Sequence, residues 1–177
     1  LQLNGEQITM DRAAGSENHL AFTIKQGLGI VYVISAFNHP VNLICHQLAT
    51  AFAAGNSALV KPASQTPLSC LKICSYFLEA GLEEGVINVL PIPGAEAEKH
   101  ISDRRIRFVS FIGSAEVGWK IPKLVANGTG YSLEHGGTAV AVVDKSADLD
   151  FASSSILKGG FYHAGQVCVS TQNVFLN

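Results

Sequence analysis

The sequence predicts an α/β fold, a Rossmann-like open parallel sheet with flanking helices. The period of the apolar residues switches repeatedly between that of a strand and that of a helix. Glycine or proline stands at several of these changes, where one element ends or the next begins. Strands that alternate with helices at this spacing are typical of a parallel sheet built with right-handed crossovers.

The N-terminal segment, residues 1–26, is expected to add short strands of its own. Leu1–Thr9 alternates around Asn4-Gly5, which is a hairpin signal, and Ala21–Lys25 is a second candidate strand. The resemblance described below begins only after this segment.

The main sheet is expected to start with the β-branched run Ile30–Ser35. Pro40 then begins a helix that reaches Ala54, and Thr66 and Pro67 supply the N-cap and first turn of the next helix. The other expected strands are Ser57–Lys61, Val86–Leu90, Arg107–Phe111, Tyr131–Leu133, Ala139–Val143 and Val174–Leu176. The other expected helices are Thr66–Gly81, Glu96–Ile101, Ser114–Ala126 and Asp148–Gly159.

Composition and charge exclude several classes of partner. The chain has 177 residues, 47% of them hydrophobic and 15% charged, with a net charge of −2, which disfavours binding to nucleic acid or to an anionic membrane. The most apolar stretch, Leu28–Phe37, is too short to span a bilayer. No secretory signal opens the chain, so we expect a cytoplasmic protein.

The four cysteines do not predict a metal site. Cys70 and Cys74 lie four residues apart on one face of an expected helix, and no second pair completes a zinc site. We expect these two and Cys45 to be small buried residues in a reducing compartment.

Ligands of open parallel sheets bind beyond the carboxyl ends of the strands, so the residues that follow each strand are the candidates for a site. Asn38 could donate its amide to a developing oxyanion, although a helix N-cap is the commoner role of such an asparagine. Lys61 could bind a ribose or phosphate, although taken alone it resembles an exposed lysine on a turn.

Three later segments carry further candidates. Gly113 and Ser114 lie where backbone and hydroxyl groups could hold a phosphate. Glu134, before two glycines, is suited to act as a general base, and Cys168 follows a glycine-containing turn as a candidate nucleophile. Each signal is weak alone, because such residues are more often solvated or structural.

The order and spacing of these residues are similar to those of the aldehyde dehydrogenase superfamily, from about Gly27 to the last residue. The patterns that carry the resemblance are Phe-Asn-x-Pro at 37–40, Ala-Gly-Asn-x-x-x-x-Lys-Pro at 54–62, Gly-Ser at 113–114, Glu-x-Gly-Gly at 134–137 and Gly-Gln-x-Cys at 165–168. The resemblance implies a dinucleotide-binding domain over 27–158 and the start of a catalytic domain over 159–177.

The resemblance also implies a reaction, the oxidation of an aldehyde to a carboxylic acid. Cys168 would attack the aldehyde, the Asn38 amide and the backbone N–H of Cys168 would bind the oxyanion, and Glu134 would activate the water that hydrolyses the thioester. Lys61 would bind the adenosine ribose and Ser114 the pyrophosphate of NADP or NAD. The remaining cofactor-binding residues would be Ile34, Phe37, Ser64, Gly94, Gly113, His135 and Gly136.

Three positions depart from the pattern of the family. Ser64 stands where many NAD-dependent members have a glutamate, and a hydroxyl near Lys61 accepts a 2′-phosphate that a carboxylate would repel, so we expect a preference for NADP. Ile112 replaces a threonine near the nicotinamide. His135 replaces a leucine and could shift the pKa of Glu134.

The segments around Lys61 and Cys168 look closest to the branch that acts on lactaldehyde and on small or phosphorylated aldehydes. Family members are much longer, so we expect a fragment with a cofactor-binding fold but little or no turnover. Its parent would be a homodimer or homotetramer.

Two alternatives remain open at this point. Cys168 and His163 could form the nucleophile and base of a thiol hydrolase, which would need no nicotinamide cofactor. The chain could also be a non-catalytic nucleotide-binding module.

Overall fold

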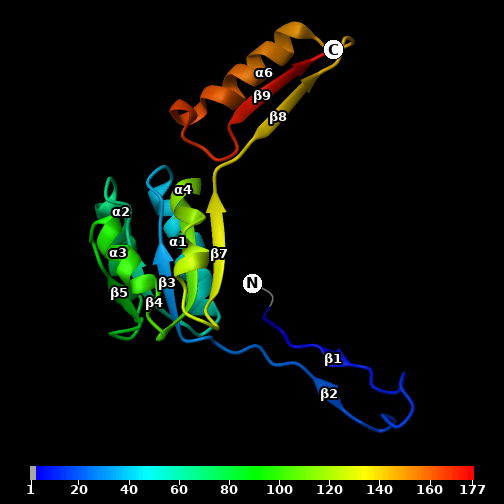
Figure 1. Ribbon diagram of the computed structural model, residues 1–177, viewed down its shortest axis with the longest axis vertical. Coiled ribbons are helices and arrows are strands. Elements are labelled where there is room, and N and C mark those ends of the chain that lie inside the picture. Colours follow the sequence, from blue (N-terminus) through cyan, green and yellow to red (C-terminus); the bar gives the residue numbers. More distant parts are fainter. Residues whose placement is uncertain (1–2) are drawn as a thin grey trace.

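The computed structural model describes residues 3–177, and its centre is a five-stranded parallel sheet (Figure 1). This confirms the predicted α/β fold. The strand order is β5 (Ile87–Val89), β4 (Ser57–Lys61), β3 (Ile30–Ile34), β6 (Ile106–Gly113) and β7 (Gly130–His135).

Helices cover both faces of the sheet because β3 is apolar on both sides. Val31 and Val33 pack with α1 (Pro40–Ala53) and α2 (Pro67–Glu79), whereas Tyr32 and Ile34 pack with the helices of the opposite face. Those helices are α3 (Gly94–Ile101) and α5 (Ile121–Leu124). The expectation that Cys70 and Cys74 are buried is confirmed, since both belong to the first of these clusters.

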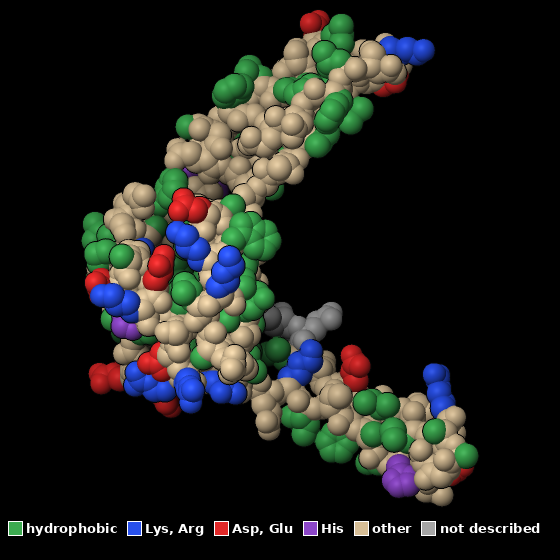
Figure 2. Space-filling model, viewed as in Figure 1, with side chains coloured by type: hydrophobic (Ala, Val, Ile, Leu, Met, Phe, Trp, Pro, Cys, Tyr) green, Lys and Arg blue, Asp and Glu red, His purple; other side chains and the backbone are tan. Residues whose placement is uncertain are grey.

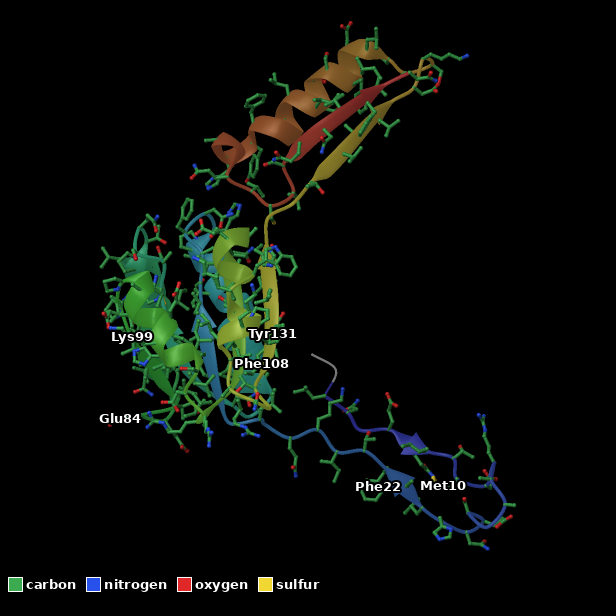
Figure 3. The ribbon with its side chains drawn as sticks, viewed as in Figure 1. Met10, Phe22, Glu84, Lys99, Phe108 and Tyr131 are labelled. Carbon is green, nitrogen blue, oxygen red and sulfur yellow. The ribbon has the colours of Figure 1, made fainter. Side chains whose placement is uncertain are left out.

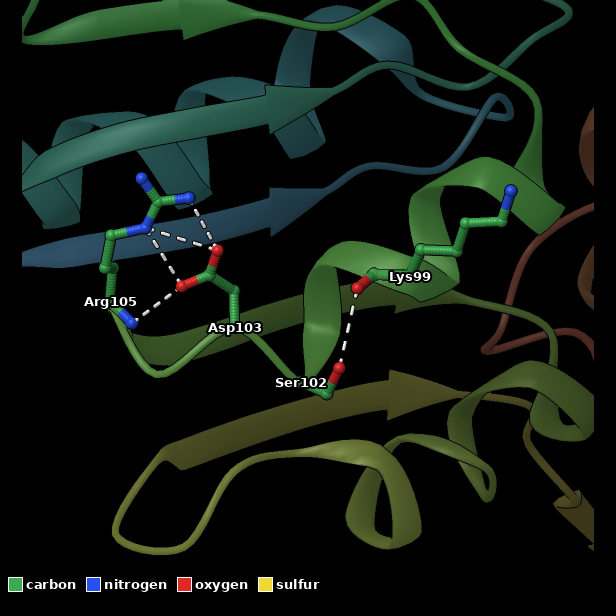
Figure 4. Close-up of polar contacts among 4 residues, drawn as sticks. All are labelled: Lys99, Ser102, Asp103 and Arg105. Atoms are coloured by element: carbon green, nitrogen blue, oxygen red, sulfur yellow. Dashed lines mark hydrogen bonds and ion pairs between the residues drawn. The ribbon is translucent and has the colours of Figure 1, made fainter.

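The turn from α3 to β6 is fastened by local polar contacts. The Ser102 hydroxyl donates to the Lys99 carbonyl, and the Arg105 guanidinium bonds to the Asp103 carboxylate (Figure 4). These bonds from Arg105 lower the pKa of Asp103 to about 2. The turn lies at the amino ends of the strands, opposite the end at which the site is expected.

The expected helix Ser114–Ala126 is wrong as a single element. It consists of α4 (Ala115–Gly118) and α5, separated at Trp119 and Lys120. Pro122 explains the break, because it has no N–H to continue the helical hydrogen bonds of α4.

The expected hairpin over Leu1–Thr9 is also not found, and its first two residues lie outside the described ones. The strand β1 (Gln7–Ile8) pairs instead with β2 (Ala21–Phe22), antiparallel. Gly5 is not a turn residue here, because it lies so close to Thr23 that a Cβ would overlap the Thr23 carbonyl oxygen. The glycine therefore permits close approach of two strands, and Figure 3 shows Phe22 on this arm, well away from Tyr131 on β7.

A second unit follows β7. The strand β8 (Ala139–Val143) pairs in parallel with β9 (Thr171–Leu176), and α6 (Leu149–Phe161) runs between them along the chain. Figures 1 and 2 show this unit and the N-terminal arm extending from the central body. The change of sheet falls between β7 and β8, earlier than residue 159, and we propose residues 136–138 as the boundary.

Among residues 3–177, no helix has both the length and the apolar character that a membrane crossing requires.

Candidate active site

A cavity of about 610 Å³ lies at the carboxyl ends of the central strands. Residues that follow β3, β4, β6 and β7 line it, together with one face of α3 and the segment before β9. Its size is that of a small-molecule or cofactor site. Every residue that the sequence analysis assigned to catalysis or cofactor binding lines this cavity: Ile34, Phe37, Asn38, Lys61, Ser64, Gly94, Gly113, Ser114, Glu134, His135, Gly136 and Cys168.

Asn38 is not the N-cap of α1, so the commoner interpretation of this residue is wrong. His39 occupies the cap position, and the Asn38 side chain turns to the other sheet, where its Nδ2 donates to the Gln166 carbonyl at 2.7 Å. A side-chain amide has two N–H groups, so the second remains available to a ligand.

Lys61, at the end of β4, is not an exposed turn residue. Only 8% of its surface is exposed, and within residues 3–177 its ammonium makes no hydrogen bond or ion pair. Burial lowers the pKa of this ammonium, because the charged form is poorly solvated. An anionic ligand in the cavity would supply the missing partner.

The other cofactor candidates leave space or offer polar groups. Ser64 is exposed, and Gly94 begins α3 with no atom near the position of a Cβ. At Gly113 a Cβ would come within 2.6 Å of the Phe111 ring, so a larger residue would displace that ring. The Ser114 hydroxyl accepts a 3.4 Å hydrogen bond from the backbone N–H of Val117.

Glu134 and Cys168 lie together although β7 of the central sheet carries the first and the turn before β9 carries the second. Glu134 lies near the end of β7, and its carboxylate neighbours the Cys168 thiol at the wall of the cavity. The neighbouring Glu134 carboxylate, followed by burial, raises the pKa of the thiol above its ordinary value. Gly137 allows the approach, since a Cβ there would overlap the Cys168 carbonyl oxygen. A raised pKa favours the protonated thiol, so a nucleophilic role for Cys168 would require an adjacent base to take its proton.

The contacts of His135 and His163 are with Trp119 and Asn38, respectively. The His135 ring packs edge-on against Trp119, with ring centroids 4.7 Å apart. His163 bonds through Nε2 to the Asn38 carbonyl at 2.8 Å, and no hydrogen bond among the described residues joins it to Cys168. These contacts favour Glu134 over His163 as the base for the cysteine.

Glu98 also lines the cavity and was not predicted from the sequence. Gly94, Ala97, Glu98 and Ile101 all line the cavity and follow the helical spacing of three and four residues, so the pattern could have revealed this face once Gly94 had been chosen. The contact of the Gln166 carbonyl with Asn38 was likewise not predicted.

The class of protein is that of a Rossmann-like open parallel sheet with a cavity of cofactor size at its strand ends, lined by a buried lysine and by a cysteine beside a carboxylate. The aldehyde dehydrogenase family model matches residues 1–177, and the chain belongs to that family.

Two curated relatives illustrate the similarity. The chain is 41% identical over 180 residues to a 3-sulfolactaldehyde dehydrogenase of Priestia aryabhattai, which covers 99% of the chain and 37% of that protein. It is 43% identical over 164 residues to a 2,5-dioxopentanoate dehydrogenase of Saccharolobus solfataricus, covering 90% of the chain and 34% of that protein. The chain thus spans little more than a third of the length of these relatives.

Two solved structures of aldehyde dehydrogenases illustrate the similarity of fold. An NADP-dependent glyceraldehyde-3-phosphate dehydrogenase from Bacillus halodurans, complexed with NADP, has a TM-score of 0.93 at 33% identity, over 99% of this chain and 37% of that one. A betaine aldehyde dehydrogenase from Staphylococcus aureus, in complex with NAD+, has a TM-score of 0.89 at 30% identity, over 98% of this chain and 34% of that one.

Proposed function

We propose that the chain is the cofactor-binding part of a longer enzyme that oxidises an aldehyde to a carboxylic acid with NADP or NAD. The observation that carries this proposal is that one cavity is lined both by the Cys168–Glu134 pair and by the buried, unpaired Lys61. The two sets of residues supply a nucleophile with its base and an anion-binding group within a single site.

The first step assigned to this chain is nucleophilic attack. Glu134 accepts the thiol proton, and the Cys168 sulfur forms a bond to the aldehyde carbon, which places negative charge on the former carbonyl oxygen. The free N–H of the Asn38 amide donates to that oxygen, and one such donor contributes roughly 3 kcal/mol to stabilising the transition state.

The second step is hydrolysis. After oxidation the acyl group is held on Cys168 as a thioester. Glu134, once it has released the thiol proton to solvent, takes a proton from water as the water attacks the thioester carbon. The carbon–sulfur bond then breaks, which releases the carboxylic acid and leaves the Cys168 sulfur as a thiolate.

The residues present fit a dinucleotide cofactor, which when bound supplies the hydride acceptor. Lys61 would pair with an oxygen or phosphate of the adenosine ribose, and Ser114 would bind the pyrophosphate. Ser64 has no charge to repel a 2′-phosphate, which supports NADP over NAD. Ile34, Phe37, Gly94, Gly113, His135 and Gly136 would line the rest of the cofactor.

A short aldehyde is the proposed substrate, as the relatives named for 3-sulfolactaldehyde and glyceraldehyde 3-phosphate suggest. We further propose that the isolated chain turns over little, that the longer enzyme is a homodimer or homotetramer, and that it works in the cytoplasm. The four unpaired thiols support a reducing compartment.

The test is the formation of reduced nicotinamide by the full-length enzyme with short aldehydes and either cofactor. Cys168→Ala should abolish it, whereas Cys45→Ala, which alters a partly buried cysteine packed against the core, should leave most of it. Calorimetric titration should give a lower Kd for NADP than for NAD. Thioester or amide hydrolysis without any nicotinamide would instead establish the thiol hydrolase.

A further inference from the structure

Two loops from different sheets are joined at the cavity by three contacts. One loop is 36–39, after β3, and the other is 162–168, before β9. Asn38 Nδ2 donates to the Gln166 carbonyl at 2.7 Å, and His163 Nε2 lies 2.8 Å from the Asn38 carbonyl oxygen. The rings of His39 and His163 are stacked, with centroids 4.7 Å apart and planes 19° apart.

The bond from His163 has a defined direction. A carbonyl oxygen only accepts, so Nε2 carries the hydrogen and donates it to Asn38. This nitrogen is therefore unavailable as a base for Cys168.

The backbone bends sharply to make this contact. His163 and Ala164 have φ angles of 53° and 55°, in the left-handed region that residues other than glycine rarely adopt. Such conformations persist where surrounding contacts hold them, and they cluster at functional sites. Here the bend brings the His163 ring against Asn38 and His39.

The two hydrogen bonds hold Asn38 at both of its ends. His163 fixes the backbone carbonyl, and the Gln166 carbonyl takes one of the two side-chain N–H groups. The amide is planar, so fixing one N–H also fixes the direction of the other. That second N–H is the one available to an oxyanion.

We propose that His163 is a positioning residue, which holds the Asn38 amide in the orientation that an oxyanion requires. The inference rests on the proposed aldehyde oxidation. His163 acts through Asn38 and does not itself touch the substrate, so its removal should lower kcat and leave the KM for the cofactor unchanged. Misplacing a donor costs up to about 100-fold in rate.

The experiment is a double-mutant cycle in the full-length enzyme with the aldehyde that it oxidises best. His163→Ala is tolerable for the backbone, since Ala164 has the same conformation, and His163→Phe keeps an aromatic ring on His39 but cannot donate. Both should lower kcat by roughly 10- to 100-fold, and His163→Gln, which restores a donor, should recover most of it. If the alanine variant fails to fold, the phenylalanine variant gives the same test.

The decisive readout is the combination with Asn38→Ala. In that background either His163 variant should lower kcat by less than about threefold, because the group that His163 positions is gone. Effects that multiply instead, or failure of His163→Gln to restore kcat, overturn the positioning role while leaving the proposed function intact. A wild-type enzyme without aldehyde oxidation overturns the proposed function itself.

Discussion

Lys61→Met should make the folded chain more stable while weakening cofactor binding. Lys61 is 8% exposed, and its ammonium has no partner among residues 3–177. Burying a polar group without a hydrogen bond costs roughly 1–3 kcal/mol, and the Lys61 ammonium lies at the low end of this range because its nitrogen still reaches the cavity. Methionine fills a similar volume without that cost. The free energy of unfolding should therefore rise by about 1 kcal/mol, which for a chain of this size corresponds to an increase in Tm of roughly 2–4 °C.

The effect has a distinct pH dependence. Because the folded pKa of Lys61 lies below the ordinary 10.5, the unfolded chain binds more protons than the folded chain between these two values. The stability of the wild type should therefore rise with pH across that window, and its difference from Lys61→Met should shrink.

The assay is thermal and urea unfolding of both proteins, with Lys158→Met, the same change at an exposed position of α6, as the matched control. The control should change Tm little. A Lys61→Met protein that is less stable than the wild type would refute the argument, because it would mean that the ammonium has a favourable partner in the folded chain. Added NADP should stabilise the wild type more than the variant.

Three further changes test the site. Glu134→Gln should lower the pKa of the Cys168 thiol, because the substitution removes the carboxylate that raises it. The pH profile of Cys168 alkylation, followed by mass spectrometry, measures this pKa. An unchanged midpoint would argue against an interaction between Glu134 and Cys168. Ser64→Glu should weaken NADP relative to NAD by about tenfold or more through charge repulsion, measured by calorimetry; an unchanged ratio would place the 2′-phosphate elsewhere. Gly137→Ala should destabilise the chain by roughly 1–3 kcal/mol, because its Cβ would overlap the Cys168 carbonyl oxygen. The control is Gly160→Ala, because a Cβ at that position would lie 3.7 Å from its nearest neighbour, the Thr171 carbonyl oxygen, and so would make only an ordinary contact.

The periodic elements of the central sheet could be predicted because their pattern is local. The run Ile30–Ser35 has a strand's β-branched residues, and Pro40 marks a helix start, so both were found within a residue of their observed bounds. The pairing of β1 with β2 was missed because it joins segments about a dozen residues apart, and Asn4-Gly5 mimics a turn signal.

The site was predictable in its residues but not in its contacts. Strand ends place Asn38, Lys61 and Glu134 at one edge of the sheet, as the topology of a parallel sheet requires. The burial of Lys61, the bond from Asn38 to Gln166 and the stacking of two histidines depend on how loops from separate sheets meet, and no periodic pattern records that.

The joint between the two sheets lies beside the reacting atoms. Glu134 lies next to the last residue of β7, and Cys168 belongs to the second unit. Gly136 and Gly137 connect the two sheets at the point where Gly137 touches Cys168. The displacement that a rotation produces grows with distance from its pivot. A hinge motion at these glycines would therefore displace the far end of the second unit widely, while the sulfur and the carboxylate, close to the pivot, keep nearly the same separation.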